Sequence, residues 1–267
     1  MEPRVKQRTG KVDIAWEEAG RGAAVVLLHA FPLNRKMWAP QVEALAGRYR
    51  VITPDFRGHG ESGVADEDST MERLAEDVGG LLDHLRIERV VLGGLSMGGY
   101  VAFAFLRRWP ERVAALVLAD TRASADTEEG RKGRHETAAV AEREGSAAIA
   151  EMMAPKLLGQ TTLEGKPEVV AAVREMILEA SPGGIAAALR GMAARSASFD
   201  LLPRITCPTL ILVGEQDGLT PPADSEAMAK AVPGSTLVRI PEAGHLSNLE
   251  QPEKFNSALQ SFLSSLD

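Results

Sequence analysis

The chain has 267 residues, 45% of them hydrophobic and 25% charged, and its formal net charge at pH 7 is −7. This length is enough for one large domain with a single core and too short for two unrelated full-sized domains. The ordinary charge content argues against global disorder, and the acidic balance, with no long run of Lys or Arg, argues against nucleic-acid binding.

Signals of export, membrane insertion and disulfide bonding are missing from the sequence. The first sixteen residues are polar and mixed in charge, so they lack the apolar centre of a signal peptide. No apolar run approaches the roughly 20 residues that a membrane-spanning helix needs. Cys207 is the only cysteine, and we expect it to be an ordinary buried residue at the start of a strand. By default we expect a cytoplasmic protein with no membrane partner.

Apolar runs of strand length alternate with helical stretches through the first half of the chain. The turn signal Thr9-Gly10 precedes an alternating segment, which predicts an antiparallel hairpin at the start. The predicted strands in this half are 12–18, 24–28, 50–53, 89–92 and 113–119; the predicted helices are 71–85, with Thr70 as its N-cap, and 97–109.

Strand-like runs disappear between residues 122 and 197, where Ala, Glu, Arg and Met dominate. We expect helical segments here, broken at Gly145, Pro155, Gly165-Lys166-Pro167 and Ser181-Pro182-Gly183-Gly184. Strands return at 209–213 and 236–240, and a final helix starts at Pro252. The pattern predicts an α/β fold with a mostly parallel central sheet flanked by helices. Residues 1–121 and 198–267 would form its core, and residues 122–197 an inserted helical lid.

A possible nucleophile lies between the fourth of the strands above and the helix that follows it, in Gly94-Leu95-Ser96-Met97-Gly98. A sharp strand-to-helix turn holds such a serine in a strained conformation and lifts its hydroxyl above the sheet. Small residues two before and two after keep the neighbouring backbone from colliding. The alternative is a glycine-rich turn with an incidental serine; a strand before and a helix after favour the nucleophile.

Four more segments accompany this turn in a fixed order, and together the five resemble the α/β-hydrolase superfamily over almost the whole chain. They are His29-Ala30-Phe31-Pro32, Asp55-Phe56-Arg57-Gly58-His59-Gly60-Glu61-Ser62, Gly214-Glu215-Gln216-Asp217 and Ala243-Gly244-His245. Such enzymes place Ser, Asp and His in this order along the chain. The resemblance implies a serine hydrolase with Ser96 as nucleophile, Asp217 as acid and His245 as base. No group of His, Asp and Glu has the spacing of metal ligands, so we expect no metal, and we expect no other cofactor.

The base and the acid each have competitors. His245 is favoured because it follows the last strand in a loop of small residues. The other four histidines are expected to have other roles. His84 and His135 lie in predicted helices and are expected at the surface. His29 and His59 are expected to organise loops at the carboxyl edge of the sheet. Asp120 ends the strand before the insertion and competes with Asp217 for the role of acid. Its other reading is a hydrogen bond that ties the insertion to the core.

By resemblance, the backbone N–H groups of Phe31 and Met97 form the oxyanion hole. Most relatives have glycine where this chain has Ala30, so the geometry of the Phe31 donor depends on how its loop accommodates a methyl group. The segment 55–62 is expected to be structural, with Asp55 and Arg57 bracing neighbouring loops.

A serine nucleophile implies an acyl-enzyme, and therefore ester, lactone, thioester or ketone substrates. Two segments, 217–222 and 243–248, resemble small bacterial carboxylesterases and enol-lactonases of aromatic catabolism. We expect a carboxylesterase acting on a small-molecule ester, and hold a lactonase of the 3-oxoadipate enol-lactonase type as the alternative. The lactonase reading favours a cation for a substrate carboxylate, with Arg122, Arg190 and Arg195 as candidates. A ligand-binding protein that kept the fold without turnover is a third reading.

Candidate substrate contacts come from the insertion and from the loop of the acid. They are Met152, Met153, Leu157, Met192 and Leu219, which either line an apolar pocket or pack the insertion against the core. The sequence is compatible with a homo-oligomer and does not predict the oligomeric state.

Overall fold

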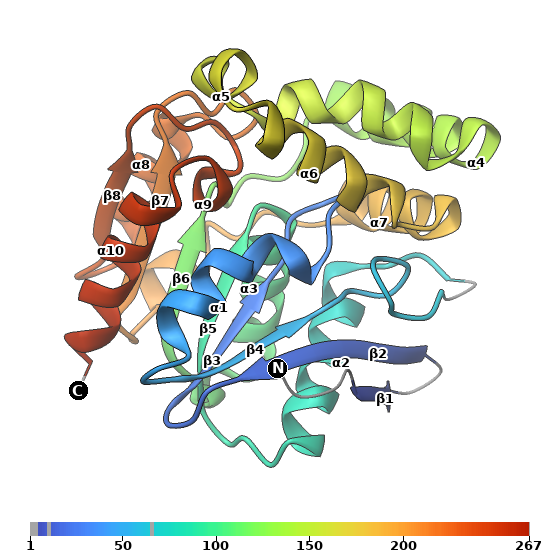
Figure 1. Ribbon diagram of the computed structural model, residues 1–267. Coiled ribbons are helices and arrows are strands. Elements are labelled where there is room, and N and C mark those ends of the chain that lie inside the picture. The colour runs from blue at the N-terminus through green and yellow to red at the C-terminus, as the bar shows by residue number, and fades with distance from the viewer. Residues whose placement is uncertain (1–4, 10–11, 65–66, 267) are drawn as a thin grey trace.

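An eight-stranded sheet runs through the centre of the molecule (Figure 1), in the order β1-β2-β4-β3-β5-β6-β7-β8. The computed structural model describes residues 5–9, 12–64 and 67–266. The pairings β1–β2 and β2–β4 are antiparallel, and all the others are parallel. The strands are β1 (Val5–Thr9), β2 (Val12–Ala19), β3 (Ala24–Leu28), β4 (Arg50–Pro54), β5 (Val90–Leu95), β6 (Val113–Ala119), β7 (Thr209–Gly214) and β8 (Thr236–Ile240). The predicted mostly parallel sheet is confirmed.

The opening hairpin is confirmed as well, because β1 pairs with β2 in register from Val5 opposite Trp16 to Thr9 opposite Val12. Gly10, the second residue of the predicted turn, lies outside the described residues. The central strands β3, β5, β6 and β7 are almost entirely buried. This burial is what their uninterrupted apolar sequences predict for strands covered on both faces.

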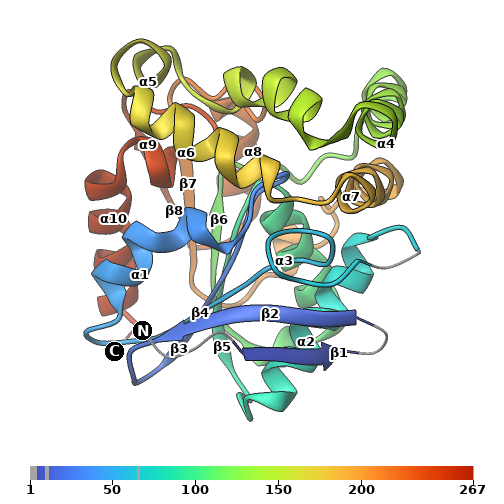
Figure 2. The same ribbon diagram turned by 45° about the vertical axis from the view of Figure 1, so that its right-hand side comes forward.

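Helices cover both faces of the sheet (Figures 1 and 2). On one face α1 packs against α10, and the rings of Trp38 and Phe255 meet there with centroids 6.1 Å apart. On the other face α2 packs against α3. The Thr70 hydroxyl caps α2 by accepting a hydrogen bond from Arg73 N, as predicted. These helices are α1 (Ala39–Leu45), α2 (Met71–His84), α3 (Met97–Arg108), α8 (Pro222–Ala231), α9 (Ser247–Glu250) and α10 (Pro252–Ser264), and the short 3-10 turns are η1 (Arg35–Trp38), η2 (Pro110–Arg112) and η3 (Leu202–Arg204).

The segment between β6 and β7 is helical and lies above the carboxyl ends of the parallel strands (Figure 1). It consists of α4 (Glu128–Leu157), α5 (Gln160–Gly165), α6 (Pro167–Leu178) and α7 (Pro182–Ala194). The predicted break at Gly145 is confirmed as a sharp change of direction within α4, where this glycine has φ 82° (Figure 2). The predicted break at Pro155 is wrong: α4 continues to Leu157. Because Pro155 lies in the last turn, its missing N–H removes only one hydrogen bond from a helix that is about to end.

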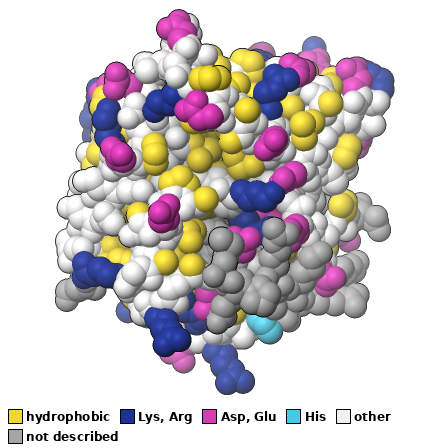
Figure 3. Space-filling model, in the orientation of Figure 1, with side chains coloured by type: hydrophobic (Ala, Val, Ile, Leu, Met, Phe, Trp, Pro, Cys, Tyr) yellow, Lys and Arg dark blue, Asp and Glu magenta, His cyan; other side chains and the backbone are white. Residues whose placement is uncertain are grey.

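Charges of both signs are interspersed with apolar side chains on the face shown in Figure 3. Within the described residues, no helix is long and apolar enough to cross a bilayer.

Candidate active site

Ser96 lies at the turn between β5 and α3, in a backbone conformation that only a well-braced residue adopts. Its φ of 54° and ψ of −113° fall outside the regions that L-residues favour, at a cost of about 1–3 kcal/mol. Ser96 N donates to Ala119 O at 2.9 Å, and Ser96 O accepts from Gly99 N at 2.9 Å and from Thr121 Oγ1 at 2.8 Å. The end of β6 and the start of α3 thus hold the strained residue in place.

The two glycines of the turn are required by close backbone contacts. A Cβ at Gly94 would lie 2.2 Å from Gly98 O, and a Cβ at Gly98 would lie 2.2 Å from Leu28 O. The predicted need for small residues on both sides of the serine is therefore confirmed. The contact of Gly98 with Leu28 also brings the start of α3 against the end of β3, from which the Phe31 loop departs.

A continuous hydrogen-bonded chain joins Ser96, His245 and Asp217, which lie on three separate loops. Ser96 Oγ is 2.8 Å from His245 Nε2, and His245 Nδ1 is 2.8 Å from Asp217 Oδ2. All three are buried; Ser96 is the most exposed, at 9%. The structure thus brings together the three residues that the sequence singles out. A serine bonded to an imidazole that is itself bonded to a carboxylate can act as a nucleophile with its own general base.

The loop after β7 donates hydrogen bonds to the Asp217 carboxylate that favour its ionised form. Oδ1 accepts from Leu219 N at 2.8 Å and from Thr220 N at 3.0 Å, while Oδ2 accepts from Thr220 Oγ1 at 2.7 Å. Burial acts to raise the pKa of Asp217, but the charge and hydrogen bond of His245 and the hydrogen bonds of Thr220 outweigh it and lower the pKa. Sequence reasoning missed Thr220. An Asp followed three residues later by Thr is a local signal of such a turn.

Asp120 does not contact His245 in the described hydrogen bonds, so the structure brings Asp217 and not Asp120 to the imidazole. Asp120 Oδ1 accepts from Gly214 N at 2.8 Å, and Oδ2 is bonded to the Ser247 hydroxyl. The alternative interpretation, in which Asp120 ties the insertion to the core, is wrong, because these two partners lie outside residues 122–197. The residue links the end of β6 to β7 and to the loop of His245. Burial and the charge of Asp217 raise the pKa of Asp120 well above its ordinary value.

The loop after β3 is fixed by a buried histidine. His29 Nε2 accepts from Phe56 N at 2.9 Å, so Nδ1 carries the proton and donates to Ala30 O at 2.9 Å. The methyl group of Ala30 is fully buried, and Ala30 N donates to Met37 Sδ at 3.1 Å. The loop that carries Phe31 therefore accommodates alanine within its packing.

The segment 55–62 braces this edge of the sheet, as predicted. Asp55 accepts from Arg35 N at 2.7 Å and from Glu61 N at 2.9 Å, and it also pairs with the Arg35 guanidinium. Arg57 makes two hydrogen bonds of 2.7 Å with Asp77 on α2.

The five predicted substrate contacts fall into two groups. Leu157 and Met192 are fully buried in the hydrophobic core, which matches the packing alternative for these two. The other three are half-buried: Met152, Met153 and Leu219.

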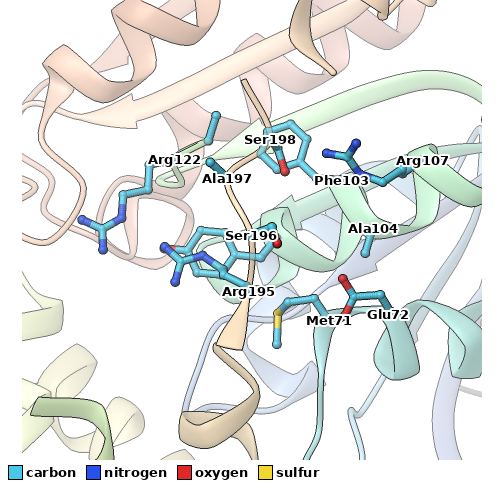
Figure 4. A pocket seen from close by; sticks show the side chains of 12 residues that line it. Met71, Glu72, Phe103, Ala104, Arg107, Arg122, Arg195, Ser196, Ala197 and Ser198 are labelled. Carbon is cyan, nitrogen blue, oxygen red and sulfur yellow. The ribbon is translucent and has the colours of Figure 1, made fainter. Parts of the chain in front are cut away.

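Two of the three candidate arginines are committed to other groups. Arg190 pairs with Asp68 at 2.6 Å and with Glu142 at 2.8 Å on the surface. Arg195 is buried, pairs with Asp126 at 2.8 Å and lies over the Tyr100 ring, 4.0 Å from its centroid. It borders a cavity of about 30 Å³, enough for about one or two waters, which is lined by the start of α2, by α3 and by residues 195–198 (Figure 4).

Arg122 differs from the other two. Its Nη2 is 2.6 Å from Asp126 Oδ1, but Asp126 also pairs with Arg134 and Arg195. One carboxylate thus faces three guanidinium groups, and the hydrogen bonds and charges of two of them, Arg134 and Arg195, lower its pKa against the opposing effect of burial. Arg122 Nε is buried without a hydrogen-bond partner among the described residues, and its guanidinium points away from the other labelled side chains of the cavity in Figure 4.

Among the described residues, no cluster of three or more His, Cys, Asp or Glu could hold a metal ion. The lone Cys207 is half-buried rather than fully buried, and burial raises the pKa of its thiol.

Known proteins resemble this chain in both sequence and structure. A thermophilic esterase from Thermogutta terrifontis, solved with malate bound, is 48% identical; the match covers 99% of both chains with a TM-score of 0.96. The enol-lactonase from Burkholderia xenovorans LB400 is 30% identical, and the match covers 97% of this chain and 100% of that one with a TM-score of 0.91. The 3-oxoadipate enol-lactonase 2 of Acinetobacter baylyi is 30% identical over 240 residues, which are 90% of this chain and 88% of that protein.

The family match bears on the whole architecture. Residues 23–252 match the alpha/beta hydrolase fold family, a range that contains Ser96, Asp217, His245 and the insertion. The sheet order, the strained serine turn and this match agree with one another. The chain belongs to the α/β hydrolase family.

Proposed function

We propose that this protein is a serine hydrolase that cleaves carboxylic esters through an acyl-enzyme on Ser96, with His245 as general base and Asp217 as the acid that orients it. The observation that carries the proposal is the hydrogen-bonded chain from the Ser96 hydroxyl to the Asp217 carboxylate, with 2.8 Å at each step. The 48% identity to an esterase over nearly the whole chain supports the same reaction class.

The reaction takes place in two halves. Ser96 Oγ attacks the ester carbonyl carbon while His245 Nε2 takes the hydroxyl proton, a transfer worth about 10²–10⁴ in rate. The tetrahedral intermediate collapses, the C–O bond to the alcohol breaks, and His245 gives its proton to the leaving oxygen. Water then attacks the acyl-enzyme with the same base, releasing the acid and restoring Ser96. Asp217 steadies the imidazolium that forms in each half.

The carbonyl oxygen becomes negatively charged in each intermediate, and we assign the backbone N–H groups of Met97 and Phe31 to receive it. Met97 is the first residue of α3, so its N–H group is one of the four at the helix start that have no partner within the helix. The contact of Gly98 with Leu28 supports this assignment, because it holds the start of α3 beside the loop of Phe31. Each such donor is worth about 10²–10³ in rate.

Residues 122–197 act as a lid over this site in our proposal, on a core formed by residues 1–121 and 198–267. Support comes from the place of α4–α7 above the carboxyl ends of the strands (Figure 1) and from the burial of all three triad residues. The half-buried Met152, Met153 and Leu219 remain the candidates for apolar contact with the substrate.

A lactonase is the second candidate, and Arg122 is the observation that favours it. The surplus of guanidinium groups around Asp126 leaves Arg122 a buried N–H without a partner, which suits a substrate that carries a carboxylate of its own. Relatives named 3-oxoadipate enol-lactonase, at 30% and 32% identity, point in the same direction.

The proposal is tested by labelling with a fluorophosphonate and by turnover of a short p-nitrophenyl ester and an enol-lactone side by side. The parent protein should be labelled and hydrolyse the ester; Ser96→Ala should lose the label and about 10⁵–10⁶-fold in kcat. Ser265→Ala, at an exposed serine near the chain end, is the matched control and should behave like the parent. Turnover of the lactone with no activity on neutral esters would favour the second candidate. A parent protein that is not labelled would leave only a binding function.

A further inference from the structure

Glu250 is a fully buried carboxylate at the end of the short helix α9, five residues after His245. Its Oε1 accepts from Gly244 N at 2.9 Å and from Leu246 N at 3.1 Å, the two amides on either side of His245. Its Oε2 accepts from Gly159 N at 2.8 Å, in the junction between α4 and α5. One side chain therefore joins the backbone around the imidazole to the helical insertion.

The α4–α5 junction lies directly against both loops that carry the base and the acid. A Cβ at Gly244 would lie 2.2 Å from Gly159 N, and a Cβ at Gly159 would lie 2.5 Å from Gln216 Oε1. Gln216, next to Asp217, also accepts from Thr161 N at 3.2 Å and donates to Thr161 Oγ1 at 2.8 Å. The insertion thus meets the two loops by backbone contact and by side-chain hydrogen bonds.

A carboxylate is the side chain that these contacts require. Three N–H groups converge on it, and only an ionised carboxylate offers two oxygens that both accept. An amide could satisfy one side, but its NH₂ group would then face an N–H donor on the other side, leaving a buried donor unpaired. Charge-assisted bonds of this kind are among the stronger ones in proteins. Lys166 adds a further tie by donating to Glu250 O from the start of α6.

We propose that Glu250 is a positioning residue: it fixes the loop of His245 on both sides and couples it to the docked α4–α5 junction, so that the imidazole reaches Ser96 only while the junction is in place. This inference rests on the proposed function of Ser96 and His245. Glu250 touches neither the substrate nor the reacting atoms, and it acts through the imidazole. A displacement of about 1 Å at a catalytic group can cost about 10²-fold in rate.

The test compares Glu250→Gln with the parent in ester hydrolysis and in the rate of fluorophosphonate labelling, which needs the same proton transfer from Ser96. We expect folded Glu250→Gln to lose at least about 10-fold in kcat and in labelling rate, with a much smaller change in KM. A purely structural role would lower the free energy of unfolding, measured in urea, and leave the folded enzyme's kcat unchanged. Glu242→Gln is the matched control. Glu242 is an exposed acid on the loop of His245, and its carboxylate pairs with Lys254.

A second variant keeps the test open if Glu250→Gln does not fold. Gly159→Ala pushes the junction away from Gly244 and leaves the Glu250 carboxylate in place, and it should slow labelling as well. Labelling of either folded variant within about twofold of the parent overturns the inference. A parent that is not labelled at all contradicts the proposed function instead, so the two failures are distinguishable.

Discussion

Asp120 directly follows β6, and Asp217 lies in the loop after the neighbouring strand β7. Both are buried, and their pKa values are displaced in opposite directions. Asp217 receives hydrogen bonds from Thr220 and faces His245, which favours its charged form. Asp120 lacks a cationic partner among its described contacts, and the negative charge of Asp217 adds to the cost of its burial. Two carboxyls at one sheet edge thus divide into an ionised one and one that holds a proton more readily.

This division predicts different outcomes for the same substitution at the two positions. Asp217→Asn should lower kcat by about 10⁴-fold, because the amide favours the wrong imidazole tautomer and gives the imidazolium no charge. Asp120→Asn should leave kcat nearly unchanged, because an amide resembles a protonated carboxyl and can still accept from Gly214 N. Steady-state kinetics on one ester would measure both. A mild Asp217→Asn together with a severe Asp120→Asn would reverse the assignment of the acid.

The sequence was enough to select Ser96 and His245, because a nucleophile turn and a histidine after the last strand are local patterns. It favoured Asp217 as the acid and kept Asp120 as a competitor, since both follow strands of the same sheet. Glu250 gave no signal at all: a glutamate before a helix looks like a solvated residue, and Gly159, which donates to its Oε2, lies 91 residues away. Such contacts arise only when the insertion docks.

At the scale of elements, the activity depends on how closely α3 approaches β3. Gly98→Ala should destabilise the protein by about 1–3 kcal/mol and abolish most ester turnover, because its Cβ would collide with the Leu28 carbonyl, a backbone group that cannot rotate away. Gly133→Ala is the matched control: it lies in α4 with no atom within 4 Å of a new Cβ. That change should stabilise the protein by up to about 1 kcal/mol. Urea unfolding and ester kinetics would check both; an active, stable Gly98→Ala would contradict the described contact.

Elements were predictable where their pattern is long and regular. The helix from Met71 and the buried strands β3 and β6 have the expected type and nearly the expected ends. The predicted break at Pro155 failed because a proline's effect depends on how much helix follows it, and only two residues of α4 do. How the insertion packs on the core depends on contacts between distant backbone segments, and no local pattern encodes those.

At the scale of the whole molecule, two buried histidines make stability depend on pH. Burial lowers the pKa of His29 to about 4 and that of His59 to about 3. Between pH 6.5, the ordinary value, and these values, the unfolded chain binds protons that the folded protein does not. The contribution of the two histidines to the free energy of unfolding is therefore complete above pH 6.5. Below that value it falls with falling pH, by about 1.4 kcal/mol per pH unit for each proton.

Asp120 acts in the opposite direction. Because its pKa is raised in the folded protein, the folded state holds a proton there that the unfolded chain releases above its ordinary pKa of 3.8. Its contribution is favourable at low pH and is lost as the pH rises, so it partly offsets the two histidines. The parent should then lose stability below pH 6.5 with a shallower slope than the two histidines alone would give.

Asp120→Asn removes the offset, so its stability should fall more steeply with falling pH than that of the parent. Urea unfolding at about pH 7, 6 and 5 measures both slopes. His135→Asn, at an exposed histidine, should leave the slope of the parent unchanged. Equal slopes for the parent and Asp120→Asn would mean that Asp120 is ionised in the folded protein. The buried edge of the sheet would then carry the charges of Asp120 and Asp217 together, and the small effect of Asp120→Asn on kcat would no longer be expected.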